Sequence, residues 1–139
     1  MTTSLKGGCI CGAVRYQCNA EPVMQVICHC RQCQRSSGAA NNPIMIVPKV
    51  ALTISGTPRY REYKADSGNT ARDGYCTQCG GHVLGATSGM ADIMAIRVAS
   101  LDDPSGFKPQ MHVFVESAQA WERIGDELPK FAKMPPMPG

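Results

Sequence analysis

The sequence has few aromatic residues and no long apolar run. Its 139 residues include one Trp, four Tyr and three Phe, so a hydrophobic core must rely on aliphatic side chains and Met. No apolar run approaches the roughly 20 residues that a membrane-spanning helix needs. No apolar stretch follows a basic start near the amino terminus either, and we therefore expect a cytoplasmic protein with no secretory signal and no membrane partner.

Clusters of basic residues are also missing. The formal net charge is +3, but Lys and Arg are scattered along the chain, and no run of them is typical of phosphate-backbone binding. We therefore expect no nucleic-acid partner. The sequence contains no Ser-His-Asp order, no glycine-rich phosphate loop and no dinucleotide fingerprint. These absences leave the cysteines as the main carriers of chemistry.

Eight cysteines are present, and seven of them fall into tight groups. The groups are Cys9/Cys11, Cys28/Cys30/Cys33 and Cys76/Cys79. An even total allows a disulfide framework. However, a reducing compartment keeps thiols free, and a group of three leaves one sulfur unpaired within its group. The grouping therefore favours metal chelation over disulfides.

The pattern of the remaining residues predicts a mainly β fold with little helix. Residues 13–19 alternate, with Val14, Tyr16 and Cys18 on one face, which indicates a half-buried strand. Further strands are expected at residues 44–47, 50–54, 60–64, 70–75, 82–86, 93–98 and 111–116, and short helical turns at 31–36 and 118–124. We predict one domain over residues 1–133 and a Pro-rich mobile tail at 134–139.

The pair Cys76 and Cys79 forms a C-x-x-C-G-G motif typical of a zinc knuckle. Such a turn directs two sulfurs and several amide groups to one point, and glycine allows the positive φ that the turn needs. A closed structural zinc site takes four ligands. Cys9 and Cys11, also followed by glycine, are the natural partners. The sequence thus predicts a structural zinc on Cys9, Cys11, Cys76 and Cys79.

The triplet Cys28, Cys30 and Cys33 offers three sulfurs within six residues. Three protein ligands leave one tetrahedral position open, which is the arrangement of catalytic zinc. A closed site with His29 or a distant residue as fourth ligand is the alternative. Because His29 lies between two ligands, we expect its side chain to point away from the metal.

The other candidate residues have ordinary structural interpretations. Cys18 shares the inward strand face and is predicted to be a buried, inert thiol. His82 and His112 are expected to be packed or hydrogen-bonded rather than ligating. Arg72 is a candidate for an anionic substrate, with a solvated strand charge as the alternative.

These motifs resemble a known family. Gly8-Cys9-Ile-Cys11-Gly12, Cys28-His29-Cys30-Arg31-Gln32-Cys33 with Ser37-Gly38-Ala39, and Cys76-Thr-Gln-Cys79-Gly80 are similar to the glutathione-dependent formaldehyde-activating (GFA) family, which includes the domain shared with centromere protein V. The resemblance implies a β-tent fold of small antiparallel sheets. It also implies a structural zinc on the four cysteines and a catalytic zinc on the triplet. The family reaction joins glutathione to formaldehyde, and its members are carbon–sulfur lyases.

The leading functional hypothesis is therefore a zinc enzyme that acts on a thiol–aldehyde adduct, with glutathione as a candidate partner. A non-catalytic zinc module that binds a partner is the alternative, and it predicts an apolar surface patch. A third hypothesis is a redox protein such as a methionine sulfoxide reductase. It needs a reactive cysteine outside the metal sites, and only Cys18, on an apolar strand face, is left for that role. Seven ligand thiolates and two zinc ions would bring the net charge to about zero.

Overall fold

The computed structural model describes residues 4–65 and 68–135. Within them the chain is mainly β, as predicted, with ten strands in two sheets and one α-helix. The strands are β1 Leu5–Gly8, β2 Arg15–Cys18, β3 Met24–Cys28, β4 Asn42–Pro48, β5 Leu52–Ser55, β6 Arg59–Lys64, β7 Thr70–Tyr75, β8 His82–Thr87, β9 Ile93–Arg97 and β10 Met111–Val113. The helix is α1 Arg31–Ser37, and 3₁₀ turns occupy Lys49–Ala51, Val98–Ser100, Pro104–Gly106 and Val115–Ser117.

The smaller sheet contains β1, β2 and β5, paired antiparallel. The alternation predicted around β2 is confirmed, because Tyr16 and Cys18 are buried while Arg15 and Gln17 lie on the other face. The Tyr16 hydroxyl is 2.6 Å from the Ser100 hydroxyl. This inward face covers the main core.

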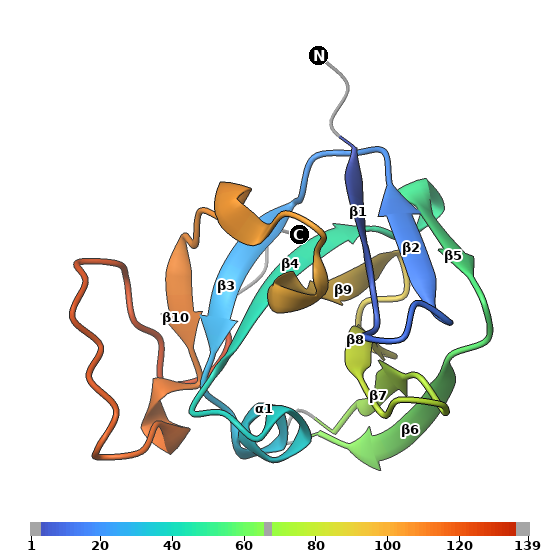
Figure 1. The fold of residues 1–139 in the computed structure, drawn as a ribbon. Coiled ribbons are helices and arrows are strands. Elements are labelled where there is room, and N and C mark those ends of the chain that lie inside the picture. The colour runs from blue at the N-terminus through green and yellow to red at the C-terminus, as the bar shows by residue number, and fades with distance from the viewer. Residues whose placement is uncertain (1–3, 66–67, 136–139) are drawn as a thin grey trace.

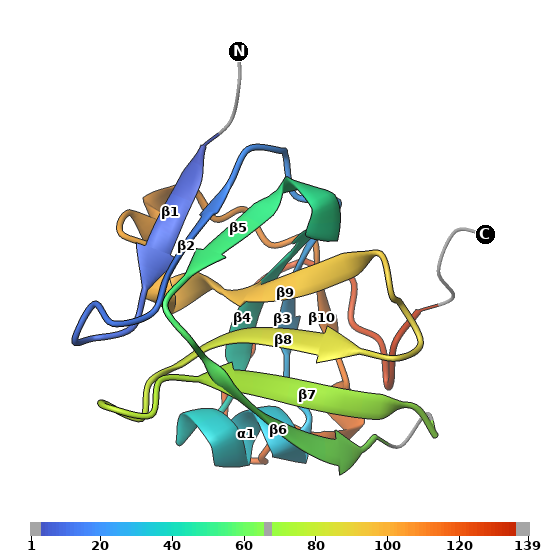
Figure 2. The same ribbon diagram turned by 90° about the vertical axis from the view of Figure 1, so that its right-hand side faces the viewer.

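The larger sheet has the strand order β10-β3-β4-β9-β8-β7-β6. Figure 2 shows β9, β8, β7 and β6 side by side beneath the smaller sheet. All pairs are antiparallel except β10 and β3, which run parallel, so the expectation of antiparallel sheets is wrong at this edge. A parallel neighbour needs a long crossover, and here most of the chain separates the two strands.

The single helix lies at the lower end of the molecule in both views (Figures 1 and 2). It was predicted at residues 31–36 and is confirmed as α1. It is capped by Cys30, and it ends at Gly38, which has a φ of 72°. Its side chains are hydrogen-bonded to β6 through Gln32 and to β9 through Ser36. The helix therefore holds the third cysteine of the triplet against the larger sheet.

The buried hydrophobic residues form two clusters. The larger lies between the sheets and includes Val14, Leu84 and Ile96 together with Cys9 and Cys76. The smaller lies around β3 and β10 and contains Val26, Cys28, Cys33 and Val113. Each cysteine group thus belongs to a different cluster.

The structure corrects several predicted boundaries. Strands β1 and β3 were not predicted, and the strand expected at 50–54 starts only after a 3₁₀ turn. The strand expected at 111–116 ends at Val113, since Phe114 adopts a left-handed conformation with φ 58°. The short helical turn expected at 118–124 is not helical: the Glu122 amide donates to the Gln119 carbonyl in a single hydrogen-bonded turn, and residues 122–124 have no regular structure.

The segment after β10 lies along the outer side of that strand (Figure 1, orange to red). It pairs with β10 through a parallel bridge between His112 and Lys130. Its backbone hydrogen bonds therefore go to the sheet rather than to a helix. Of the predicted tail, residues 134–135 have no regular structure and 136–139 lie outside the described residues. The domain boundary at 133 stays a prediction.

Candidate metal centres

The first cysteine group joins the two sheets. Cys9 and Cys11 follow β1, and Cys76 and Cys79 lie in the turn between β7 and β8. Their four Sγ atoms all lie within 4.8 Å of one another, with 3.7 Å between Cys9 and Cys11 and 3.6 Å between Cys11 and Cys76. A tetrahedral zinc with Zn–S bonds of about 2.3 Å holds its sulfurs about 3.8 Å apart. The group could therefore hold one metal ion.

Two similar turns present these sulfurs. Gly12 and Gly80 have φ values of 79° and 77°, a conformation that glycine adopts without steric cost. The Gly80 amide donates to the Cys76 carbonyl over 2.8 Å, and the Gly12 amide donates to the Cys9 carbonyl over 3.2 Å. The Val14 amide donates to Cys9 Sγ over 3.3 Å. The turns thus aim backbone donors at the sulfurs, as a knuckle should.

The thiols of this group differ in acidity. Burial raises the pKa of Cys9, but the Val14 amide and the neighbouring thiols donate to its sulfur and bring the pKa down to about 6. A hydrogen bond from the backbone at Ala13 lowers the pKa of Cys11, while burial and the neighbouring sulfurs raise it, to about 11 overall. Without a metal the group therefore shares few negative charges, and a bound cation would release protons.

The second group is the triplet Cys28, Cys30 and Cys33. Cys28 ends β3, Cys30 is the N-cap of α1, and Cys33 lies within the helix. Their Sγ atoms also lie within 4.8 Å of one another, and within the described residues no His, Asp, Glu or fourth Cys completes this group. The Cys33 amide donates to Cys30 Sγ over 3.2 Å. The triplet could hold a metal ion with three sulfurs.

Crowding splits the acidities of these three thiols. Hydrogen bonds from the Cys28 and Cys33 thiols lower the pKa of Cys30 to about 3. The same bond to Cys30 raises the pKa of Cys28. For Cys33, the hydrogen bond with Cys28 lowers the pKa, but the Cys30 sulfur and burial raise it, to about 12 overall. Without a metal, these shifts favour a thiolate on Cys30 beside two thiols.

His29 is completely buried, and its ring does not belong to the group of possible ligands at the triplet. Its Nδ1 is 3.0 Å from a Glu122 carboxylate oxygen, and its Nε2 is 2.8 Å from His112 Nδ1. His112 Nε2 is in turn 2.8 Å from Asp126. His112 is therefore hydrogen-bonded, as predicted. Sequence reasoning missed Glu122 altogether, since no local signal links it to a residue 93 positions away.

A buried charge cluster lies beside α1 and was also missed. Arg97 and Asp73 are both nearly buried and are 3.2 Å apart. Arg97 also donates to the Ser36 hydroxyl over 3.1 Å, and the Asn42 amide oxygen accepts from its other nitrogens. Arg61 approaches Asp73 to 3.4 Å. The positive charge of Arg97 lowers the pKa of Cys33, partly opposing the effects that raise it.

The other sequence candidates have structural roles. Cys18 is completely buried in the larger cluster. His82 stacks on Tyr75 with ring centroids 5.6 Å apart, and burial lowers its pKa. Arg72 is half-exposed, lies over the Tyr60 ring and is 3.5 Å from Glu62. The interpretation of Arg72 as a solvated strand charge therefore fits the structure.

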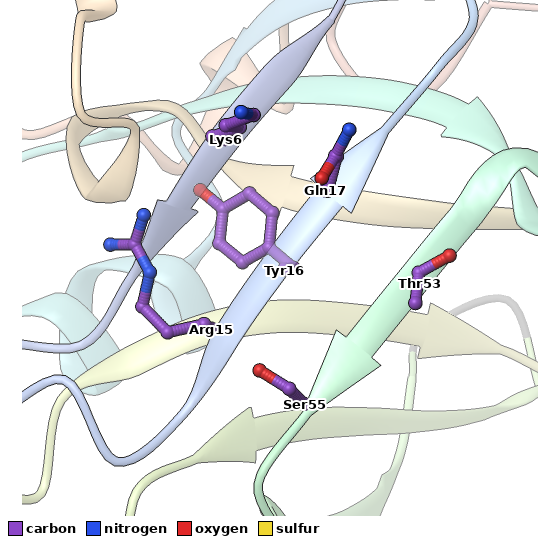
Figure 3. A pocket seen from close by; sticks show the side chains of 6 residues that line it. All are labelled: Lys6, Arg15, Tyr16, Gln17, Thr53 and Ser55. Atoms are coloured by element: carbon purple, nitrogen blue, oxygen red, sulfur yellow. The ribbon is translucent and has the colours of Figure 1, made fainter.

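A hollow of about 270 Å³ lies on the smaller sheet, and Figure 3 shows the side chains that line it. It is lined by Lys6, Arg15, Tyr16, Gln17, Thr53 and Ser55. Arg15 is engaged by Asp102 at 2.8 Å, and the lining contains no cysteine, histidine or carboxylate. A second hollow of about 480 Å³ lies between α1 and Trp121. Neither contains the cysteines that could hold a metal.

The fold and the two cysteine groups define a small, mainly β protein whose thiols could hold two metal ions. The family model described as glutathione-dependent formaldehyde-activating enzyme (GFA) matches residues 4–117, and the chain therefore belongs to this family, as its motifs indicated. No curated protein matches the chain. A crystal structure of a Rhodobacter sphaeroides protein is similar in fold, with 23% identity, a TM-score of 0.55, and coverage of 75% of this chain and 91% of the other.

The described residues contain no helix long and apolar enough to cross a membrane.

Proposed function

We propose that the protein is a zinc-dependent carbon–sulfur lyase that acts on a thiol–aldehyde adduct, with glutathione and formaldehyde or related small molecules as its two components. One observation carries the proposal: the triplet gathers three sulfurs around one point without a fourth ligand among the described residues. Three ligands leave a coordination position for a substrate atom. The family match supports the choice of thiol and aldehyde.

The two groups take different roles in this proposal. Cys9, Cys11, Cys76 and Cys79 hold a structural zinc that ties the two sheets together. Cys28, Cys30 and Cys33 hold the catalytic zinc. Both donor sets suit zinc, which favours thiolate ligands at about 2.3 Å. Zinc bound at the triplet would polarise a carbonyl oxygen or lower the pKa of a substrate thiol.

The reaction moves one proton between the thiol sulfur and the aldehyde oxygen. In the direction of synthesis, the thiol sulfur bonds to the aldehyde carbon, the carbonyl π electrons move to oxygen, and the thiol proton ends on that oxygen; the lyase direction reverses these changes. Cys30 supplies a thiolate ligand from the start, because its pKa is low. Arg97 adds a fixed positive charge near Cys33, which favours an anionic centre.

A non-catalytic zinc module is the alternative. Among the described residues, the exposed large hydrophobic side chains are Ile10, Val23, Val50, Trp121 and Met134, and each comes from a different segment. Single exposed apolar residues are common on monomeric proteins. They give the alternative less support than the open triplet gives to catalysis.

The reaction is tested by mixing glutathione and formaldehyde with the zinc-loaded protein and following adduct formation and breakdown by NMR exchange. We expect the wild-type protein to accelerate the exchange and Cys30→Ser to lose the acceleration. Cys18→Ala is the matched control, since it removes a buried thiol that belongs to neither group. Equal rates for wild type, Cys30→Ser and buffer would contradict the proposed reaction and favour the binding module.

A further inference from the structure

We propose that the carboxyl-terminal segment of residues 118–133 sets the geometry of the three-cysteine centre through the hydrogen-bonded chain Glu122–His29–His112–Asp126, with Glu122 as the main positioning residue. The inference rests on the proposed metal site at the triplet. It concerns residues that do not touch the reacting atoms. It also gives a role to a part of the chain that lies beyond the family match at residues 4–117.

Every polar group of His29 is engaged. Its amide donates to the Val113 carbonyl over 3.0 Å, and its carbonyl accepts from the Gln34 side chain over 2.7 Å. Its two ring nitrogens contact Glu122 and His112 at 3.0 and 2.8 Å. The residue between two of the three sulfurs is thus fixed at both backbone and ring.

Glu122 is itself held in place. Its second carboxylate oxygen accepts from the Asn41 amide over 2.7 Å, and its side chain is only 11% exposed. A nearly buried carboxylate with both oxygens hydrogen-bonded is well ordered, because leaving either partner unsatisfied is costly. Glu122 therefore has a fixed position at one end of the hydrogen-bonded chain.

The other end of the chain is anchored on the same segment. His112 Nε2 is 2.8 Å from Asp126, whose pKa is lowered by this hydrogen bond. The His112 amide donates to the Pro129 carbonyl, and the Phe131 amide donates to the His112 carbonyl, each over 2.9 Å. The segment is thus hydrogen-bonded to the backbone of β10 and, through Glu122 and Asp126, to both histidine rings.

Fixing His29 also fixes the neighbouring sulfurs. In extended backbone, the side chains of residues i and i+2 point to one side and that of residue i+1 to the other. Cys28 ends a strand and Cys30 has extended dihedral angles, φ −65° and ψ 154°. A ring locked on one side therefore holds the Cys28 and Cys30 sulfurs on the other. Contacts of this kind around metal ligands are typically worth about 10- to 100-fold in metal affinity.

The test measures metal release from the fully loaded chain rather than catalysis. Co²⁺-loaded protein is mixed with the chelating dye 4-(2-pyridylazo)resorcinol, and release is followed together with the visible Co²⁺ bands. The triplet phase is assigned as the one that Cys30→Ser lacks. We expect Glu122→Gln to accelerate this phase about 10- to 100-fold and to shift its Co²⁺ bands, while the four-cysteine phase keeps its rate.

Two further variants sharpen the result. Asp126 contacts the histidine pair through His112 and also accepts from the Leu128 amide. Because Asp126 is 43% exposed, we expect Asp126→Asn to fold and to give a smaller acceleration. Glu127→Gln is the matched control: Glu127 is an exposed carboxylate next to Asp126 in the same segment, and it should leave both phases unchanged. Equal acceleration of both phases would indicate a general loss of stability and would overturn the inference.

The two proposals fail in different ways. If the wild-type chain loads the triplet but Glu122→Gln and Asp126→Asn release metal at the wild-type rate with unchanged bands, the positioning role is wrong and the proposed function stands. If the wild-type chain holds no metal at the triplet, the proposed function is wrong and the inference fails with it.

Discussion

The two cysteine groups solve the same problem in different surroundings. Cys9 and Cys76 are part of the larger hydrophobic cluster between the sheets, whereas Cys28 and Cys33 belong to a small cluster with Val26 and Val113. The first group also joins two sheets whose strands do not pair with one another. A metal at the first group therefore supports the whole fold, while a metal at the second is supported by it.

The two cysteine groups also differ in the polar groups that surround them. Backbone amides in two tight turns surround the four-cysteine group. Charged side chains surround the triplet, with Arg97 and Asp73 beside the helix and Glu122 behind His29. Side chains can be tuned by substitution, whereas turn amides are fixed by the backbone. The surroundings of the triplet can therefore be changed by substitution more readily than those of the four-cysteine group.

The largest effect is expected for Cys76→Ser. We expect it to prevent stable folding, because structural zinc contributes about 10–16 kcal/mol in small zinc-dependent domains. Circular dichroism and zinc content per chain would show it, with Cys18→Ala as the control thiol. A folded Cys76→Ser protein that still binds zinc at the triplet would refute the structural role of the first group.

Arg97→Gln should have the next largest effect. It leaves the Asp73 carboxylate, only 5% exposed, with the half-exposed Arg61 as its remaining ion-pair partner in the described structure. Breaking a buried pair in this way costs about 3–5 kcal/mol in the free energy of unfolding. Denaturant unfolding of the zinc-loaded protein measures the loss. Arg72→Gln, at an exposed pair, should cost less than about 1 kcal/mol; equal losses would contradict the proposed importance of burial.

The pH dependence of metal binding should separate the groups. The pKa of Cys30 is lowered to about 3, while that of Cys33 is raised to about 12 and that of Cys28 is raised too. Between pH 6 and 8 a metal ion must therefore displace about two protons from the triplet, and its affinity should fall about 100-fold per pH unit on acidification.

The first group should lose affinity less evenly. Cys9 titrates at about pH 6, so one more proton competes with the metal below this pH than above it. Calorimetry in buffers of different ionisation enthalpy gives the number of protons released at each site. A triplet affinity that does not change between pH 6 and 8 would show that its thiols are already ionised.

Among the cysteine substitutions, the smaller effect on stability is expected for Cys30→Ser. Serine is a good N-cap residue and can accept the hydrogen bond from the Cys33 amide that Cys30 accepts now. We expect the metal content to fall by about one ion per chain, with a change of less than about 2 kcal/mol in the free energy of unfolding. Unfolding of this variant as complete as that of Cys76→Ser would remove the distinction between the two groups.

The sequence was most informative where contacts are local. The spacing within each cysteine pair and within the triplet, the turn glycines and the alternation around Tyr16 depend on residues a few positions apart. The joining of Cys11 to Cys76, which lie 65 positions apart, was inferred from the number of ligands that a closed zinc site takes, and the structure brings the four sulfurs together. Strand β3 was missed because its apolar residues do not alternate strictly, and β1 because Gly7 and Gly8 weaken any strand pattern. Short strands of this kind are stabilised by their neighbours rather than by their own propensity.

The supporting shell of the triplet was not predictable from spacing. Glu122 lies 93 residues from His29, and Arg97 looks like an ordinary charge at the end of a strand. A short helical turn was predicted at residues 118–124, but the backbone bonds to β10 are made further on, at Pro129 and Phe131. Long-range polar contacts leave no periodic signal, because they depend on where the sheet brings distant segments together.

The parallel pairing of β10 with β3 has a consequence for synthesis. A growing chain carries all four ligands of the first group once residue 79 has left the ribosome, and a metal ion can then close that group. The loop that carries Cys28 and Cys30 can pack against β10 and Glu122 only after those residues have also left the ribosome, about 40 residues later than residue 79. The four-cysteine group can therefore close before the surroundings of the triplet are complete.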